Sequence, residues 1–157
     1  NTRFAIKLRG DEWYSNLSMV ADTLRSDPEK IHTLPVFFRK WDIWPYHPSD
    51  HLMAAKTENL KIMFDSCLLN ILSGNNIHPK KWPLPSESVI GKSYMDAKIG
   101  ESENPKEDFK KLFGILPIEM LKYYKVVYNG MNRVWHSNFN PQDDGSWEKS
   151  ITSMDDL

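Results

Sequence analysis

The sequence predicts an α+β fold that is mostly helical, with a long central helix, flanking helices and a small sheet. Apolar residues recur at helical spacing over residues 50–72, and weaker helical periods occur over residues 12–25 and 106–135. Residues 3–9 instead alternate apolar and polar side chains, as a strand does. A chain of 157 residues is long enough for one domain with its own core and too short for two ordinary domains.

The first elements follow from local spacing. The alternation over residues 3–9 ends at Gly10, which predicts a short half-buried strand. Residues 12–25 carry apolar side chains at helical spacing and predict an amphipathic helix. Residues 34–38 are apolar but include Pro35, which restricts them to an edge strand or an extended segment.

Residues 50–72 predict the central helix. Its apolar stripe passes through Phe64, Cys67 and Ile71, and Gly74 with the two asparagines after it ends the helix. The last two turns are apolar almost all round. We therefore expect this helix to be covered on several sides, with Phe64 and Ile71 in the core and Cys67 as an unreactive buried thiol.

The second half of the chain is less regular. Residues 74–105 contain several prolines and no sustained period, so they predict a long Pro-containing loop within the domain. Inside it, residues 89–99 fit either a short strand, which would join the sheet with 3–9 and 34–38, or a helix. Residues 106–135 predict two helical pieces, the second from Ile118 to Trp135, and 147–157 predict a short closing helix.

Composition excludes several classes of protein. Twenty basic and 21 acidic residues leave a net charge of -1, so no large field of one sign indicates a polyanionic partner. The single cysteine, Cys67, excludes a disulfide scaffold and favours a reducing compartment, so we expect an intracellular, cytoplasmic protein. No apolar run is long enough for a bilayer span, and we expect no membrane partner. The start at Asn1, without an initiator Met, fits a single domain excised from a larger protein.

No motif predicts a catalytic or metal site. Ser86–Ser93 is one residue from a phosphate-binding P-loop, but prolines precede it where that motif needs a strand, which favours an ordinary loop turn. His47 and His51 are four residues apart, yet Pro48 separates them, which favours capping or surface roles over zinc binding. We expect no cofactor and no metal. An enzyme is not favoured, and its least poor candidate site is the corner from His47 to His51.

Two regions carry candidate binding residues. The first is the aromatic cluster of Trp41, Trp44 and Tyr46, whose large rings could anchor a partner protein. The alternative is that these rings pack over the core where the chain turns toward the predicted central helix. Both interpretations fit the sequence, because prolines at 45 and 48 fix a corner there.

The second region is basic. Residues 106–133 carry six Lys or Arg and three acids, whereas residues 134–157 carry one Lys and five acids. In the predicted helix, Lys122, Tyr123, Lys125 and Arg133 combine cations with rings, the mixture that single-strand binders use for phosphate contact and stacking.

The sequence therefore predicts a non-catalytic protein-interaction or docking module of a larger protein or assembly. Its partner would be another protein or a flanking domain of the parent chain, contacted through Trp41, Trp44 and Tyr46. The alternative is a nucleic-acid-contacting domain of a larger replication or transcription protein, which would use the helices over residues 106–135.

Overall fold

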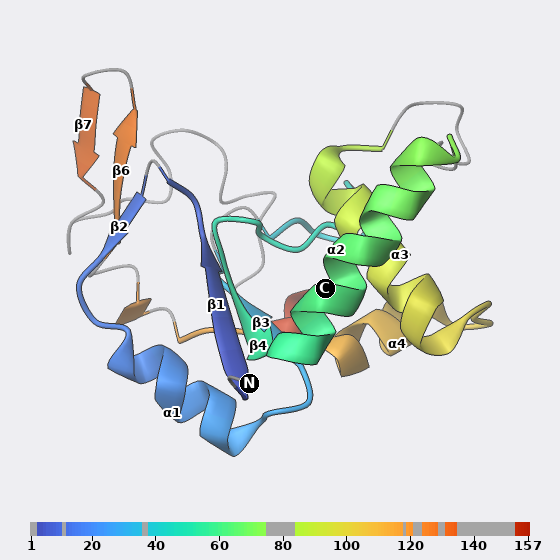
Figure 1. Cartoon of the computed structure of the whole chain (residues 1–157), viewed down its shortest axis with the longest axis horizontal. Coiled ribbons are helices and arrows are strands. Elements are labelled where there is room, and N and C mark those ends of the chain that lie inside the picture. Colours follow the sequence, from blue (N-terminus) through green and yellow to red (C-terminus); the bar gives the residue numbers. More distant parts are fainter. Residues whose placement is uncertain are drawn as a thin grey trace.

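The chain folds as an α+β protein in the computed structural model, whose elements are shown in Figure 1. The structure describes residues 3–10, 12–35, 38–74, 84–117, 119–120, 124–128, 131–134 and 153–157. The strands are β1 (Phe4–Leu8), β2 (Glu12–Tyr14), β3 (Ile31–Thr33), β4 (Leu52–Lys56), β5 (Phe113–Ile115), β6 (Tyr124–Tyr128) and β7 (Met131–Val134). The helices are α1 (Ser18–Ser26), α2 (Thr57–Leu72), α3 (Ser86–Ile99), α4 (Pro105–Leu112) and the 3-10 turn η3 (Met154–Asp156).

The main sheet has the strand order β1-β4-β3-β5. Strand β4 is antiparallel to both of its neighbours, and β3 pairs in parallel with β5 at the far edge. Residues 52–55 of β4 are all apolar and all buried, with no polar residue between them. A continuous apolar run is typical of a strand that is covered on both faces.

Helices cover the two faces of this sheet unequally. Figure 1 shows α2, α3 and α4 on one side of the sheet and α1 on the other. The larger core cluster includes Tyr94 of α3, Phe109 of α4 and Phe113 of β5, all completely buried. The smaller cluster includes Val20 and Leu24 of α1. The three-helix side therefore holds the larger of these two core clusters.

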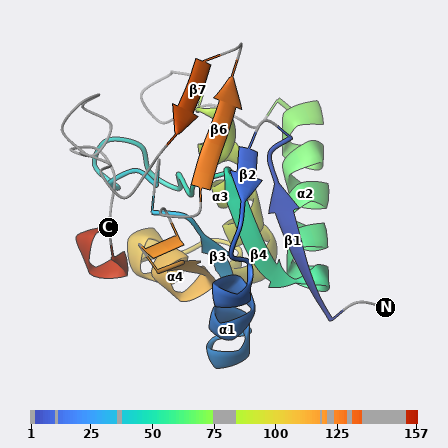
Figure 2. The same cartoon turned by 90° about the vertical axis from the view of Figure 1, so that its left-hand side faces the viewer.

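A second sheet, with strand order β2-β6-β7, stands near the end of β1 (Figure 2). Glu12 of β2 ties it to the main sheet. Its carboxylate, which is fully buried, lies 3.3 Å from Nε of Arg9 and also pairs with His51, next to β4. The Tyr14 hydroxyl donates to the same carboxylate at 2.7 Å. A buried carboxylate needs such partners, because losing them would leave an uncompensated charge.

The strand predicted over residues 3–9 is confirmed as β1, and Gly74 follows the end of α2 with a φ of 71°. The helix predicted over residues 50–72 exists only from Thr57 onward, so the long central helix is not found. Residues 52–56 form β4 instead. A short apolar run that pairs on both sides satisfies its backbone in the sheet, a choice that apolar content alone cannot reveal.

Two elements predicted in the N-terminal part of the chain lie at shifted positions. The helix expected over residues 12–25 begins only at Ser18, because residues 12–14 pair with β6. Residues 34–38 were expected to form an edge strand or an extended segment, and no strand forms at the described residues 34, 35 and 38. The strand lies earlier, at Ile31–Thr33, and residues 36 and 37 lie outside the described part of the chain. In both cases long-range pairing overrides the local pattern.

The loop expected over residues 74–105 is wrong for most of the described part. Residues 86–99 form α3, so of the two alternatives for residues 89–99 the helix is found and the strand is not. Pro105 begins α4, and residues 75–83 lie outside the described residues. Small residues on the buried face conceal the helical period of α3, namely Ser88, Gly91 and Ser93. Prolines at the first turn of a helix are tolerated, so they mark helix starts here rather than a loop.

The second helix expected over residues 118–135 is also wrong. Its described residues include the antiparallel strands β6 and β7. The sequence does carry a hairpin signal, because Asn129-Gly130 separates two stretches with β-branched or aromatic residues. Of the closing helix expected over residues 147–157, the described residues hold only the turn η3, and residues 147–152 lie outside them.

Candidate protein-binding surface

Helix α2 has one buried face, which packs against the sheet and α3. Two side-chain hydrogen bonds fix its position. Asn59 Nδ2 donates to the Glu29 carbonyl at 3.1 Å, and Asn70 Nδ2 donates to Ser93 Oγ of α3 at 2.8 Å. The buried residues of the helix are Asn59, Leu60, Met63 and Cys67.

The other side of α2 is apolar and exposed. Five of the twelve exposed large hydrophobic side chains among the described residues lie in its last nine residues. Their exposed fractions are 38% for Phe64, 57% for Leu68, 64% for Leu69, 52% for Ile71 and 75% for Leu72. We call these five residues the α2 apolar face. Phe64, Leu68 and Ile71 are spaced by four and then three residues, so they form one stripe along the helix.

A charged pair lies on the same exposed side as these apolar residues: Asp65 precedes Leu68 by three residues and Leu69 by four, so it neighbours both on the helix surface. Lys61 and Asp65 form an ion pair along the helix, and their side chains are 73% and 61% exposed. An exposed pair of this kind contributes about 0.5 kcal/mol or less to helix stability. Because the two opposite charges cancel, the apolar side chains around them remain the main recognition feature of this surface.

Of the predictions for α2, one is wrong and one is confirmed. The expectation that Phe64 and Ile71 are core residues is wrong, since both are exposed. Cys67 is buried, as expected, in a small cluster with Leu84 and Val89. This burial raises the pKa of the Cys67 thiol above its ordinary value. A thiol with a raised pKa is a weak nucleophile at neutral pH.

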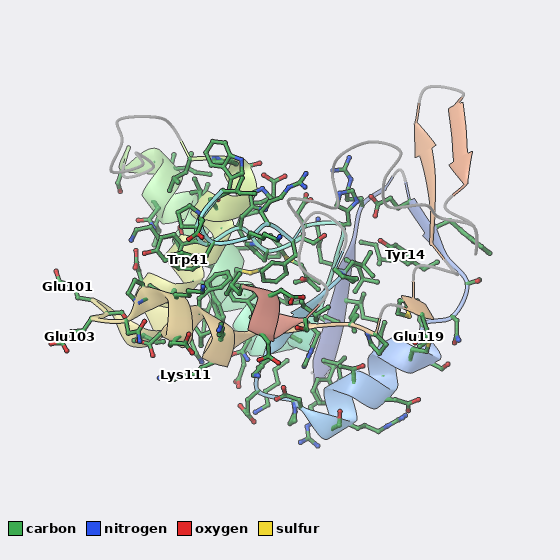
Figure 3. The ribbon with its side chains drawn as sticks, turned by 180° about the vertical axis from the view of Figure 1, so that it is seen from behind. Tyr14, Trp41, Glu101, Glu103, Lys111 and Glu119 are labelled. Atoms are coloured by element: carbon green, nitrogen blue, oxygen red, sulfur yellow. The ribbon has the colours of Figure 1, made fainter. Side chains whose placement is uncertain are left out.

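Residues 41–46, which we call the aromatic turn, hold the sequence-predicted contact residues in two environments. Trp41 packs edge-on against Tyr46, with ring centroids 4.6 Å apart, and against Phe109 of α4 at 5.7 Å. Figure 3 shows Trp41 beside α4. Trp44 is 36% exposed, next to the similarly exposed Ile43. The structure thus brings Trp41 and Tyr46 together at the edge of the core and leaves Trp44 at the surface.

The end of the aromatic turn is clamped onto α3. A Cβ atom added at Gly91 would lie 2.1 Å from the Tyr46 carbonyl oxygen and 2.9 Å from Cδ of Pro48. Only glycine permits this approach of two backbones. Tyr46 itself has a φ of 61°, a left-handed conformation that is unfavourable for an aromatic residue. The packing around its ring therefore compensates for a strained backbone.

The two histidines beside this turn have separate carboxylate partners. His47 lies 3.7 Å from Glu87 of α3, whereas His51 pairs with Glu12 of β2. Among the described residues, no three His, Cys, Asp or Glu side chains converge as metal ligands would. Desolvation by burial lowers the pKa of His47, and the negative charge of Glu87 opposes that shift. These contacts give both histidines structural partners.

The other sequence candidates do not form one site. Ser86–Ser93 lies entirely within α3, so it lacks the loop that a phosphate-binding motif requires. Lys122 and Tyr123 lie outside the described residues. Lys125 lies in β6 opposite Trp13, and Arg133 lies in β7 opposite Val126. The helix that was expected to align these four residues is absent from the described part of this region.

Comparisons with known proteins identify no relative: no family model, curated protein or solved structure matches this chain. Among the described residues, no helix has the length and apolarity needed to cross a membrane.

The α2 apolar face is not predicted from the sequence, because every apolar side of this helix fits a core position there. One signal was present. The last two turns of α2 are apolar around most of the circumference, more than one sheet and one neighbouring helix can cover. A surplus of this kind in a small domain indicates either a second covering element or a binding surface.

Proposed function

We propose that this chain is a protein-interaction domain and that the α2 apolar face is its principal contact surface. The observation that carries the proposal is the concentration of five exposed large apolar side chains within Phe64–Leu72. Scattered surface hydrophobics are normal, but a contiguous group on one element usually marks a site of association. Covering such side chains yields about 25 cal/mol per Å² of apolar area removed from water.

The occupant that fits this face best is an amphipathic helix of another protein. The four-then-three spacing of Phe64, Leu68 and Ile71 is that of a helix-packing seam. A partner helix with apolar residues at matching spacing would place them between these side chains. The balanced charges of Lys61 and Asp65 offer no strong preference for an acidic or a basic partner.

The length of the face disfavours a stable homodimer through α2 alone. Eight steps at 1.5 Å per residue give the stripe from Phe64 to Leu72 a length of about 12 Å. A stable interface usually buries about 800 Å² on each partner, which a two-turn stripe cannot supply by itself. The face is better suited to one docked helix within a larger contact.

Site-specific photo-cross-linking in the cells that make the protein tests this proposal. A photoreactive residue at position 68 or 72 should give the same adduct with another protein, and one at the exposed Asp22 of α1 should not. Ile71→Asp should remove the adduct while leaving the unfolding midpoint nearly unchanged, because Ile71 is half exposed. Equal cross-linking from position 22, or adducts only between copies of this chain, would contradict the proposal.

The alternative of nucleic-acid contact relied on helices over residues 106–135. Among the described residues, α4 forms in the first part of this range, but β6 and β7 stand where the second helix was expected. A salt titration of oligonucleotide binding separates the two functions. Contacts to phosphates would make affinity fall steeply as salt rises, whereas docking on the uncharged α2 apolar face would change little.

A further inference from the structure

Strand β1 is an edge of the main sheet, and half of its backbone faces away from it. Figure 2 shows β1 as the outermost strand, next to β4. The Thr57 N–H donates to the Arg3 carbonyl at 3.2 Å, and the Arg9 N–H donates to the His51 carbonyl at 3.3 Å. Odd-numbered residues therefore bond to β4, and the alternation of antiparallel pairing directs the N–H and C=O groups of Phe4, Ile6 and Leu8 outward.

This outward row is open to a further strand. No described residue bonds to the backbone groups on the outer side of Ile6 and Leu8. Their side chains are 38% and 41% exposed, at the margin of the sheet face that α1 covers. The other edge differs, because β5 is only three residues long and its Phe113 and Gly114 are buried. Unpaired edges with exposed apolar residues are templates for strand addition.

The charged side chains on β1 determine which kind of strand can pair with its outer edge. Arg3, Lys7 and Arg9 occupy three of the four odd-numbered positions from 3 to 9, with Ala5 at the fourth, and residues 3–9 include no acid. Lys7 Nζ and Arg9 Nη1 lie 3.6 and 3.9 Å from Oδ2 of Asp50, and Arg9 Nε also lies 3.3 Å from Glu12. Arg3 has no carboxylate within ion-pair distance among the described residues. The edge therefore keeps an excess of positive charge.

This charge pattern disfavours a second copy of the chain. Pairing β1 with itself about Ile6 would place Arg3 directly opposite Arg9 of the other copy. A shift centred on Lys7 would place Lys7 opposite Lys7. Like charges directly opposite each other destabilise a strand pair, whereas opposite charges stabilise it.

We propose that the outer edge of β1 binds an extended, acidic segment of a partner protein by strand addition. Main-chain hydrogen bonds to Ile6 and Leu8 would supply the pairing. Aliphatic side chains at alternate positions of the segment would cover those two residues, and acidic side chains between them would face the cations, Arg3 above all. This site is independent of the α2 apolar face, so either surface can fail its test without affecting the other.

Amide hydrogen exchange of the full chain tests this proposal with a blocked eight-residue peptide of alternating Val and Glu as the probe. The outward amides of Ile6 and Leu8 should exchange at least about tenfold more slowly with the peptide, because only hydrogen-bonded amides are protected. The amides of Ala5 and Lys7, already bonded to β4, should change little. A peptide of alternating Val and Lys should protect Ile6 and Leu8 much less.

Two variants make the result specific. Ile6→Pro removes an outward N–H that β4 does not use, so it should abolish protection of Leu8 by the peptide, whereas Ile6→Val should retain it. If Ile6→Pro lowers stability, Arg3→Glu gives an independent answer, since it should reverse the preference between the two peptides. Unchanged exchange at Ile6 and Leu8, equal protection by both peptides, or slow exchange caused by dimers of the free chain would overturn the proposal.

Discussion

The aromatic turn and the α2 apolar face are both dense in large apolar side chains, yet they meet the rest of the protein in different ways. The turn directs Trp41 and Tyr46 against Phe109, and leaves Trp44 at the surface. Helix α2 buries residues on its sheet-facing side and leaves Phe64 and Leu68 exposed. The difference shows that neighbouring elements, and not apolar content, determine which side chains form the core.

The largest expected effect comes from the aromatic turn, because two tryptophans lie three residues apart in different environments. Trp41→Ala should lower the free energy of unfolding by about 3–5 kcal/mol, since it removes ring contacts at the edge of the core. Trp44→Ala should cost about 1 kcal/mol or less, as surface substitutions usually do. Chemical denaturation of the two variants measures both values. Equal losses would mean that the turn is uniformly core or uniformly surface.

If Trp44 contacts a partner, as the sequence predicts for the aromatic cluster, Trp44→Ala should also weaken association by about 2 kcal/mol or more. That result would add the turn to the contact surface. Unchanged association, combined with nearly unchanged stability, would restrict the proposed interface to the α2 apolar face.

Within α2, Met63 and Leu68 make a matched pair on opposite sides of one helix. Met63 is fully buried, so Met63→Ala should cost about 2–5 kcal/mol through lost burial and a cavity. Leu68 is more than half exposed, so Leu68→Ala should change stability by about 0.5 kcal/mol. The denaturation midpoints of the two variants provide the comparison. A large loss for Leu68→Ala would mean that another part of the chain covers this face, and the proposed contact surface would be wrong.

The sequence predicts the α+β class, strand β1 and the burial of Cys67, because each depends on local spacing or on a single strongly apolar stretch. It fails where distant partners decide the outcome. Residues 52–55 suit a helix or a buried strand equally, and only pairing with β1 and β3 selects the strand. In α3, Gly91 is a poor helix former by itself, but the Tyr46 carbonyl occupies the place that a side chain would take there. The exposed side of α2 was unpredictable for the same reason.

The smallest expected effect concerns pH and the attachment of the aromatic turn to α3. His47 lies directly after the turn, and its burial disfavours the charged imidazolium, so its pKa is lowered in the folded protein. Glu87 and Asp50 act in the opposite direction, and Arg39 adds to the lowering. An unfolded chain has a histidine pKa of about 6.5, so below that pH the unfolded state binds more protons than the folded state.

Stability should therefore be greatest above the unfolded histidine pKa of about 6.5 and should decline as pH falls through the window between that value and the lower folded pKa. His47→Gln removes the titrating group at similar size, so its unfolding free energy should depend less on pH in that window. Denaturation midpoints of both proteins measured between about pH 5 and 8, with His51 and the other histidines unchanged, isolate this contribution. If the native protein instead gained stability on acidification relative to His47→Gln, attraction to Glu87 would outweigh burial. The junction between the turn and α3 would then behave as an ion pair, which would add to the packing at Gly91 in holding the turn on the helix.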